Sequence, residues 1–336
     1  MTQQPSAEGI QRSLFDQTKP AMPHGIWVPT LTADRPNRSG SAAVEYVDSA
    51  SVLTPGAGFT KRFKFTLNPY SGCRFACEYC YARFFAPSVE DQEAWGEWVR
   101  VKQNAVDLIE RAKRSRVAAR RLESGDAIYM SSVTDPYQPV ERKIGLTRAI
   151  LEALLPVQPR LTIQTRSPIV TRDIDLLRQF RRIRVNFTVT TDWEEMRLRY
   201  EPHCPANEVR LEAAQELVTA GVPIGISISP MLPMRDPATF GRRIAALNAA
   251  EYVTQFFKPT RSRFSAGSTA AALAKMREDG WTDQRYEAAR VAIQRALGPD
   301  KPLLRDAEGY APVPEHNEPV EQLHQAGMEK HSTARG

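Results

Sequence analysis

Long apolar runs are missing from this sequence, and so is an apolar segment behind a basic N-terminus. No stretch of about 18 apolar residues occurs, which argues against a membrane span. The chain begins MTQQPSAEGIQRS, which lacks the apolar centre of a secretory signal. We therefore expect a cytoplasmic protein in a reducing compartment, where structural disulfides are rare.

Cysteine is also scarce: four occur in 336 residues, and three of them fall within eight positions. In a reducing compartment, clustered cysteines more often bind a metal or perform chemistry than form disulfides. The fourth, Cys204, stands alone in the sequence, and we interpret it as a bystander.

Neither sign of charge is in large excess, since 45 Lys and Arg against 39 Asp and Glu give a net charge of +6. Basic residues do crowd residues 111–121, and Arg178, Arg181, Arg182 and Arg184 follow. Such runs can neutralise phosphates, which makes DNA or RNA one candidate substrate class. The favoured interpretation is that they are the solvated faces of amphipathic helices.

Composition divides the chain into three parts. Residues 1–58 are rich in Pro, Ser, Thr and Gly and are expected to be irregular. Residues 59–260 alternate between apolar patterns and are expected to form the core domain. Residues 261–336 are expected to form a helical extension with a polar, disordered tail.

Six short apolar segments in the core domain are predicted to be strands, with helical patterns between them. The predicted strands are 63–67, 127–130, 161–165, 185–191, 224–229 and 253–257. The predicted helices are 101–121, 146–155, 171–181, 206–220, 237–250 and one or two within 266–300. This alternation predicts an α/β fold with a parallel sheet, and six units suit a partial (β/α)6 barrel better than an eightfold one. A doubly wound sheet is the alternative.

The three clustered cysteines lie in the segment NPYSGCRFACEYCYARFF, residues 68–85. Cys73, Cys77 and Cys80 have the spacing C-x3-C-x2-C, and thiolates are the ligands of iron–sulfur clusters. Three ligands on a four-iron cluster would leave one iron open to a substrate or cofactor. Structural zinc usually takes four ligands, often from two C-x-x-C pairs, and no second pair occurs. The pattern favours a cluster over zinc, for which Cys204 or His203 would be the fourth ligand.

With Tyr79 before the third cysteine, the segment resembles the radical SAM superfamily signature C-x3-C-x-aromatic-C. The flanking motifs SSVTDPYQPVE, TRS and PMLP resemble the spore photoproduct lyase-like (DNA repair photolyase-like) branch, over about residues 60–260.

The resemblance implies a partial (β/α)6 barrel of radical SAM type, a [4Fe–4S] cluster and S-adenosylmethionine (SAM). It implies an enzyme that reductively cleaves SAM to methionine and a 5′-deoxyadenosyl radical, which abstracts hydrogen from a substrate. It also implies a reductant such as flavodoxin or ferredoxin.

Several residues are assigned to the cofactor through this resemblance. In similar proteins a Lys or Arg at the TRS position binds the SAM carboxylate, which here is Arg166, with Ser167 beside it. Ser131 and Asp135 follow the second predicted strand and resemble residues that touch the amine or ribose of SAM. Asp135 precedes a proline and is equally well explained as a turn former.

Four further residues complete the predicted cofactor set. Thr188 and Thr190 alternate with Val189, so both face one way, toward the ribose or methionine part of SAM or into a core. Ile228 could pack on adenine, and Tyr79 is expected to cover the cluster and limit solvent access.

Glu201 and Arg210 resemble a branch motif and are either an ion pair or cofactor contacts.

Two residues are assigned to catalysis. Tyr81 matches a tyrosine that the lyase branch links to radical relay, with packing over the cluster as the alternative. Ser132 falls at or near the position where the authentic lyase has a hydrogen-donating cysteine. A serine O–H bond is too strong to donate hydrogen as a thiol does, so spore photoproduct repair is not expected and the substrate stays open.

Two competing functions come from other classes. One is a zinc-stabilised nucleic-acid-binding module without catalysis, which the strand–helix alternation and the lack of a second cysteine pair oppose. The other is an electron-transfer iron–sulfur protein, which three clustered ligands rather than four oppose.

Overall fold

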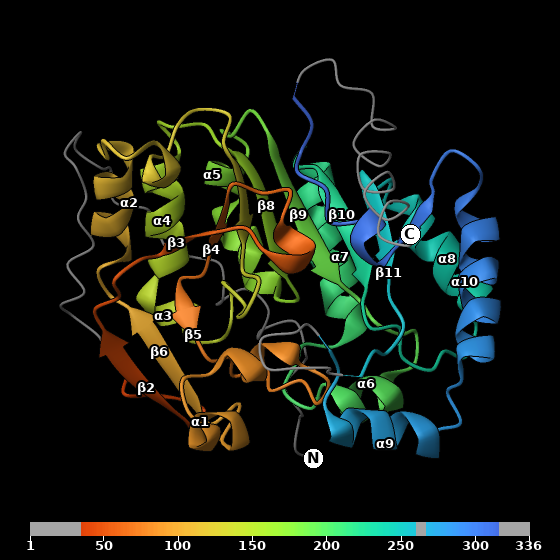
Figure 1. Ribbon diagram of the computed structural model, residues 1–336. Coiled ribbons are helices and arrows are strands. Elements are labelled where there is room, and N and C mark those ends of the chain that lie inside the picture. Colours follow the sequence, from red (N-terminus) through yellow and green to blue (C-terminus); the bar gives the residue numbers. More distant parts are fainter. Residues whose placement is uncertain (1–34, 260–266, 316–336) are drawn as a thin grey trace, which may run out of the picture. The chain divides into compact units, whose positions relative to one another are not determined.

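A computed structural model describes residues 35–259 and 267–315, and its main feature is a sheet of eight strands (Figure 1). The strand order is β12-β11-β10-β9-β8-β7-β4-β3. Neighbours from β4 to β12 pair in parallel, and β3 is antiparallel to β4. The bounds are β3 Leu53–Pro55, β4 Phe65–Leu67, β7 Ala127–Met130, β8 Arg160–Thr165, β9 Ile183–Thr188, β10 Ile224–Ile228, β11 Glu251–Thr254 and β12 Leu303–Arg305. The predicted α/β fold with a parallel sheet is confirmed.

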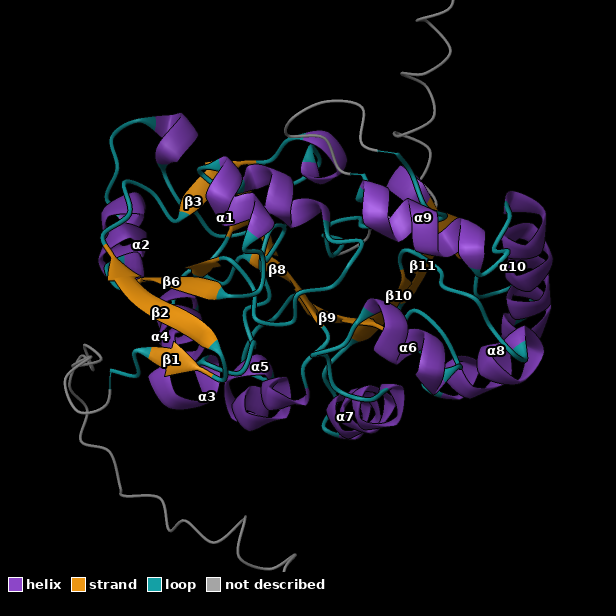
Figure 2. Cartoon of the chain, turned by 90° about the horizontal axis from the view of Figure 1, so that it is seen from below, coloured by secondary structure: helices purple, strands orange, loops and turns teal. Residues whose placement is uncertain are grey.

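Helices connect the parallel strands. Their bounds are α1 Val89–Glu93, α2 Ala105–Lys113, α3 Glu141–Ile144, α4 Leu146–Leu154, α5 Ile174–Leu177, α6 Glu194–Tyr200, α7 Asn207–Thr219, α8 Pro237–Ala246, α9 Ala270–Glu278 and α10 Asp283–Leu297. Figure 2 shows α5 and α7 along one side of the strands, and α7 contacts both β9 and β10. Helices α8 and α10 pack against each other. Within the described ranges, no helix has the length and apolar character that crossing a membrane requires.

A second sheet contains four strands, two of which precede the cysteine segment in sequence, one lies within it and one follows it. Its order is β1-β2-β6-β5, with bounds β1 Arg38–Ser39, β2 Ala42–Val47, β5 Tyr70–Ser71 and β6 Trp98–Lys102. Residues 38–55, expected to be irregular, therefore contain three strands, while residues 1–34 lie outside the described ranges. The predicted helix 101–121 spans only 105–113, because residues 98–102 pair with β2 and β5.

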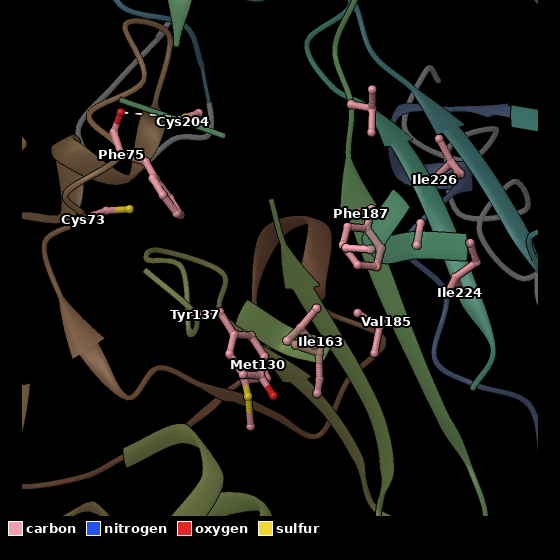
Figure 3. Close-up of a cluster of buried hydrophobic side chains, with 14 of the residues drawn as sticks. Cys73, Phe75, Met130, Tyr137, Ile163, Val185, Phe187, Cys204, Ile224 and Ile226 are labelled. Atoms are coloured by element: carbon pink, nitrogen blue, oxygen red, sulfur yellow. Dashed lines mark hydrogen bonds between the residues drawn. The ribbon is translucent and has the colours of Figure 1, made fainter. Parts of the chain in front are cut away.

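The two faces of the large sheet differ because side chains alternate along each strand. One face is apolar and packs under the helices; Figure 3 shows Ile163, Val185, Phe187, Ile224 and Ile226 on three adjacent strands. The opposite face, called here the inner face, carries polar and aromatic side chains from the alternate positions. Examples are Tyr129, Gln164, Asn186, Thr188 and Ser227.

The chain after β12 crosses the inner face. Arg184 Nη2 donates to the carbonyl of Ala311 and to Glu251 Oε1, both at 2.8 Å, and the Ala311 N–H donates to Glu251 Oε2 at 3.3 Å. Arg160 reaches the carbonyl of Val313 at 3.4 Å. Strand β12 and this crossing were not predicted for the extension 261–336, in which α9 and α10 match the predicted helices; residues 316–336 lie outside the described ranges.

We expect Arg184→Met to destabilise the fold, because the side chains of Arg184 and Glu251 are 7% and 4% exposed. The substitution leaves a buried carboxylate without its hydrogen-bonded cation, which costs about 3–5 kcal/mol. Urea unfolding measures the change. Arg178→Met, at an exposed arginine of the same region, is the control and should change stability by less than about 0.5 kcal/mol. Equal stability of the two variants would contradict this account.

Candidate active site

A cavity of about 460 Å³ opens on the inner face at the C-terminal ends of the parallel strands. This is the position that a barrel architecture predicts for chemistry. The cysteine segment forms part of its wall, since Cys73, Cys77 and Cys80 all line it. The other lining residues discussed below are Phe59, Lys61, Tyr79, Tyr81, Tyr129, Ser131, Ser132, Asp135, Gln164, Arg166, Thr188, Ser227, Ser229, Pro230, Gln255, Phe256, Lys258 and Tyr310.

The cysteine segment starts at a turn that only glycine fits. Gly72 has φ +77°, and a Cβ there would lie 2.5 Å from the carbonyl oxygen of Trp98 in β6. This close approach to β6 brings Cys73 to the cavity wall immediately after β5. The local fold of the predicted ligands therefore depends on a strand that sequence periodicity did not reveal.

Structural zinc and iron–sulfur clusters are the two kinds of centre that take clustered thiolates as ligands. Within residues 35–259 and 267–315, no group of three or more His, Cys, Asp or Glu side chains converges as the ligands of one ion do. Structural zinc needs four ligands around a single point. The thiolates of an iron–sulfur cluster bind different irons, so they surround a volume instead.

The thiols also differ in their electrostatic surroundings. Burial raises the pKa of Cys73, and it raises the pKa of Cys80 to about 11. The pKa of Cys77 is lowered instead, because the Cys204 thiol hydrogen-bonds to it and Arg166 adds positive charge. A metal centre would supply the positive charge that deprotonates the other two thiols.

Next to this segment, the fully buried carboxylate of Glu201 accepts hydrogen bonds from four side chains. The donors are Tyr79 Oη, Arg166 Nη1 at 3.0 Å, Thr190 Oγ1 at 2.8 Å and Arg210 Nη2. Burial alone would raise the pKa of Glu201, but Arg210 and Arg166 outweigh it and lower the pKa to about 2. Glu201 and Arg210 are therefore an ion pair, and neither lines the cavity.

Arg166 lies where the end of β8 meets the cavity. Its backbone N–H donates to Asp135 Oδ2 at 3.0 Å, and its Nη1 donates to Tyr79 Oη at 2.9 Å and to Glu201. Among the described residues, the hydrogen bonds of the guanidinium all run through Nη1. Because a guanidinium has five N–H donors, those on Nε and Nη2 stay available to an anionic ligand in the cavity.

Asp135 acts as a turn former at the same edge. Its Oδ1 accepts from Thr165 Oγ1 at 2.7 Å and from the Tyr137 N–H at 2.9 Å. Burial raises the pKa of Asp135, against the opposing effect of these hydrogen bonds. Asp135 lines the cavity and joins the ends of β7 and β8, which fixes the backbone of Arg166.

Ser131, Ser132 and Tyr81 come together beyond β7. The Tyr81 hydroxyl donates to the carbonyl of Ser132, and Ser132 Oγ accepts from Asn68 Nδ2 at 3.3 Å. Ser131 Oγ is buried and has no hydrogen-bond partner among the described residues, although the residue lines the cavity. An orphaned hydroxyl at a cavity wall fits a bound polar ligand.

Three residues assigned to the cofactor do not line the cavity. Ser167 Oγ accepts from the Ile169 N–H at 3.3 Å and caps the following turn. Thr190 donates to Glu201. Ile228 faces the helices, because the period of β10 places Ser227, not Ile228, on the inner face. We leave these three out of the proposed binding set.

Sequence reasoning missed several lining residues. The pattern IGISISP already contains a signal for Ser227 and Ser229, since apolar residues at every second position put the serines on the opposite face. Tyr310 gave no such signal, because it follows a short strand in a segment expected to be a polar tail. Its hydroxyl lies 3.0 Å from Ser227 Oγ, and its ring contacts Tyr129.

Comparison with known proteins gives one family. The model of the Radical SAM superfamily matches residues 67–243. An uncharacterized protein of Methanocaldococcus jannaschii is 38% identical over 170 residues, which cover 51% of this chain and 61% of that protein. An uncharacterized protein of Acidianus two-tailed virus is 31% identical over 175 residues, covering 50% of this chain and 56% of that one. The matched segment thus spans little more than half of these relatives.

Solved structures of spore photoproduct lyase share the fold. The complex with dinucleoside spore photoproduct superposes with a TM-score of 0.53 at 15% identity, covering 76% of this chain and 78% of that chain. A variant with bound AdoMet and the same dinucleoside gives a TM-score of 0.54 at 14% identity, with the same coverage. At this identity the likeness concerns the fold alone, and it confirms the predicted barrel type.

We expect Glu201→Ala to destabilise the protein by about 3–5 kcal/mol, because it leaves two arginines next to each other without their shared anion. Chemical unfolding measures the loss. Glu208→Ala removes an exposed carboxylate that pairs with Arg243, and this control should cost less than about 1 kcal/mol. If Glu201→Ala lowers the free energy of unfolding by less than about 1 kcal/mol, the hydrogen bonds of Glu201 do not stabilise the fold as expected.

Proposed function

The chain belongs to the radical SAM superfamily, and on this premise we propose that it reductively cleaves SAM at a [4Fe–4S] cluster to a 5′-deoxyadenosyl radical that abstracts hydrogen from a substrate. One observation carries the proposal: the three cysteines and Arg166 line the same cavity at the strand ends. Members of this family use SAM and an iron–sulfur cluster and need a reductant. A small electron carrier such as flavodoxin or ferredoxin would serve.

Different residues of the cavity wall would bind the cluster and SAM. Cys73, Cys77 and Cys80 would hold the cluster, with Tyr79 limiting solvent access beside it. Arg166 would bind the SAM carboxylate through the N–H groups that Glu201 does not use.

Two further side chains would contact the rest of SAM. Ser131 offers an orphaned hydroxyl, and Thr188 is placed on the inner face by a hydrogen bond from Gln164 Nε2 at 2.7 Å. Asp135 lies at the same wall and would act chiefly by holding the backbone of Arg166.

Tyr81 and Ser132, the two residues assigned to catalysis from the sequence, both line the cavity. The Tyr81 hydroxyl donates to the backbone carbonyl oxygen of Ser132, which by the resemblance falls at or near the position of the hydrogen-donating cysteine of the lyase branch. A phenol gives up a hydrogen atom more easily than an aliphatic hydroxyl does. We assign hydrogen-atom relay to Tyr81 and the shaping of the cavity wall to Ser132.

We further propose DNA or RNA as the class of substrate. The favoured interpretation placed the basic run 111–121 on the solvated face of a helix. Arg111 and Lys113 do lie in α2, but α2 ends at Lys113, and only the short 3-10 helix Ala118–Arg120 follows in the rest of the run. Arg116 and Arg120 in this stretch are exposed, and Lys61 and Lys258 line the cavity. Lys61 and Lys258 are therefore cations placed to contact a phosphate group in the cavity.

The metal content tests the proposed function. Protein purified without oxygen should contain about four irons and matching sulfide per chain, and with dithionite and SAM it should form 5′-deoxyadenosine. Cys77→Ala should lose both cluster and cleavage, whereas Cys204→Ala should keep the cluster. One zinc ion per chain, or an intact cluster that does not cleave SAM, would contradict the proposed function.

Arg166→Ala should weaken SAM binding and leave the iron content unchanged. Loss of a charged hydrogen bond worth about 1.5–3 kcal/mol raises the dissociation constant about 10- to 150-fold. Glu201 keeps its ion pair with Arg210 in this variant, so we expect the fold around the site to stay intact. Equilibrium binding of SAM to the reconstituted protein measures the effect, with Arg178→Ala as the exposed control. Cluster loss in Arg166→Ala would contradict the assigned role.

A further inference from the structure

Cys204 lies against one of the proposed cluster ligands although 127 positions separate them in sequence. Its Sγ is 3.5 Å from Cys77 Sγ, and both residues are buried. Figure 3 shows Cys204 beside Phe75 of the cysteine segment, whose carbonyl oxygen is 3.8 Å from Cys204 Sγ. Cys77 lines the cavity, whereas Cys204 does not.

The backbone of Cys204 is held firmly in this place. Arg197 Nη1 donates to its carbonyl oxygen at 2.7 Å, and its N–H donates to the Glu201 carbonyl oxygen at 3.1 Å. Arg166 Nη1 lies 4.0 Å from its sulfur. The thiol therefore belongs to the same buried network that positions Arg166, and it is not the bystander that its place in the sequence indicated.

The direction of the sulfur–sulfur hydrogen bond follows from proton counting. Cys204 has one S–H proton and two acceptors in reach, the Cys77 sulfur and the Phe75 carbonyl oxygen. Cys77 would bind iron as a thiolate and would have no proton to donate. A negatively charged sulfur is also the stronger acceptor, and it is the nearer one. Cys204 is then the donor and Cys77 the acceptor.

We propose that Cys204 is a positioning residue that donates a hydrogen bond to the Cys77 thiolate and raises the reduction potential of the cluster. Hydrogen bonds to the sulfurs of a cluster stabilise its reduced, more negative state. A higher potential makes reduction by a flavodoxin- or ferredoxin-like donor easier. This inference rests on the proposed function, because it needs the cluster on the three cysteines.

The test is a redox titration of the reconstituted holoprotein in the absence of SAM. Electron paramagnetic resonance measures the fraction of reduced cluster at each potential. Cys204→Ala and Cys204→Val both remove the donor, and Val keeps nearly the volume of the thiol in case the smaller side chain impairs folding. Both should shift the midpoint potential to more negative values at unchanged iron content. Cys204→Ser, which keeps an O–H donor, should recover part of the shift.

Three outcomes would overturn the inference. Potentials equal to that of the wild type in Ala and Val variants with intact clusters would show that the thiol does not tune the cluster. Equal shifts in Ser, Ala and Val would show a packing effect rather than a hydrogen bond. Iron loss in these variants would make Cys204 a ligand. In each case the wild-type protein would still cleave SAM, whereas failure of the proposed function would appear in the wild type as a missing cluster or missing cleavage.

Discussion

The arrangement of the site depends on the hydrogen bonds and ion pairs of one buried carboxylate, that of Glu201. A fully buried, ionised group is costly unless cations and hydrogen bonds compensate for lost solvation. Here the compensation comes from the cysteine segment through Tyr79, from the end of β8 through Arg166, from beyond β9 through Thr190, and from α7 through Arg210. Four parts of the chain that are distant in sequence meet at one charge, so none can shift without breaking a buried contact.

This shared anchor couples the two halves of the proposed chemistry. The segment that supplies the cluster ligands and the cation assigned to SAM contact the same carboxylate, and the Tyr79 hydroxyl bridges them. Cys204 joins the set through the backbone of Glu201. The cysteine segment and Arg166 are therefore fixed relative to each other, which is what a reaction between the proposed cluster and SAM would require of the residues that hold them.

Prediction from sequence succeeded where a single period or spacing dominates. Strand β7 at residues 127–130 was predicted with its observed bounds, because a short apolar run is bounded by turn residues on both sides. The cysteine spacing likewise defines a local motif. Strand β6 was not predicted. Its five residues run into the apolar pattern of α2, and its partners β2 and β5 lie far from it in sequence. Contacts made across sequence, such as Cys204 with Cys77, have no local signal at all.

The substrate is the part of the function that family membership leaves open, and the cavity shows why. The family match ends at residue 243, yet Gln255, Phe256, Lys258 and Tyr310 line the cavity, and so do Phe59 and Lys61 before the match begins. The three clustered cysteines, Arg166 and Thr188 lie within the match, and they are the residues proposed to hold the cofactors. Tyr310 lies on the inner face, where Arg184 and Glu251 bind the neighbouring backbone of Ala311. Residues outside the family match therefore form part of the cavity wall, and the match to the family carries no information about them.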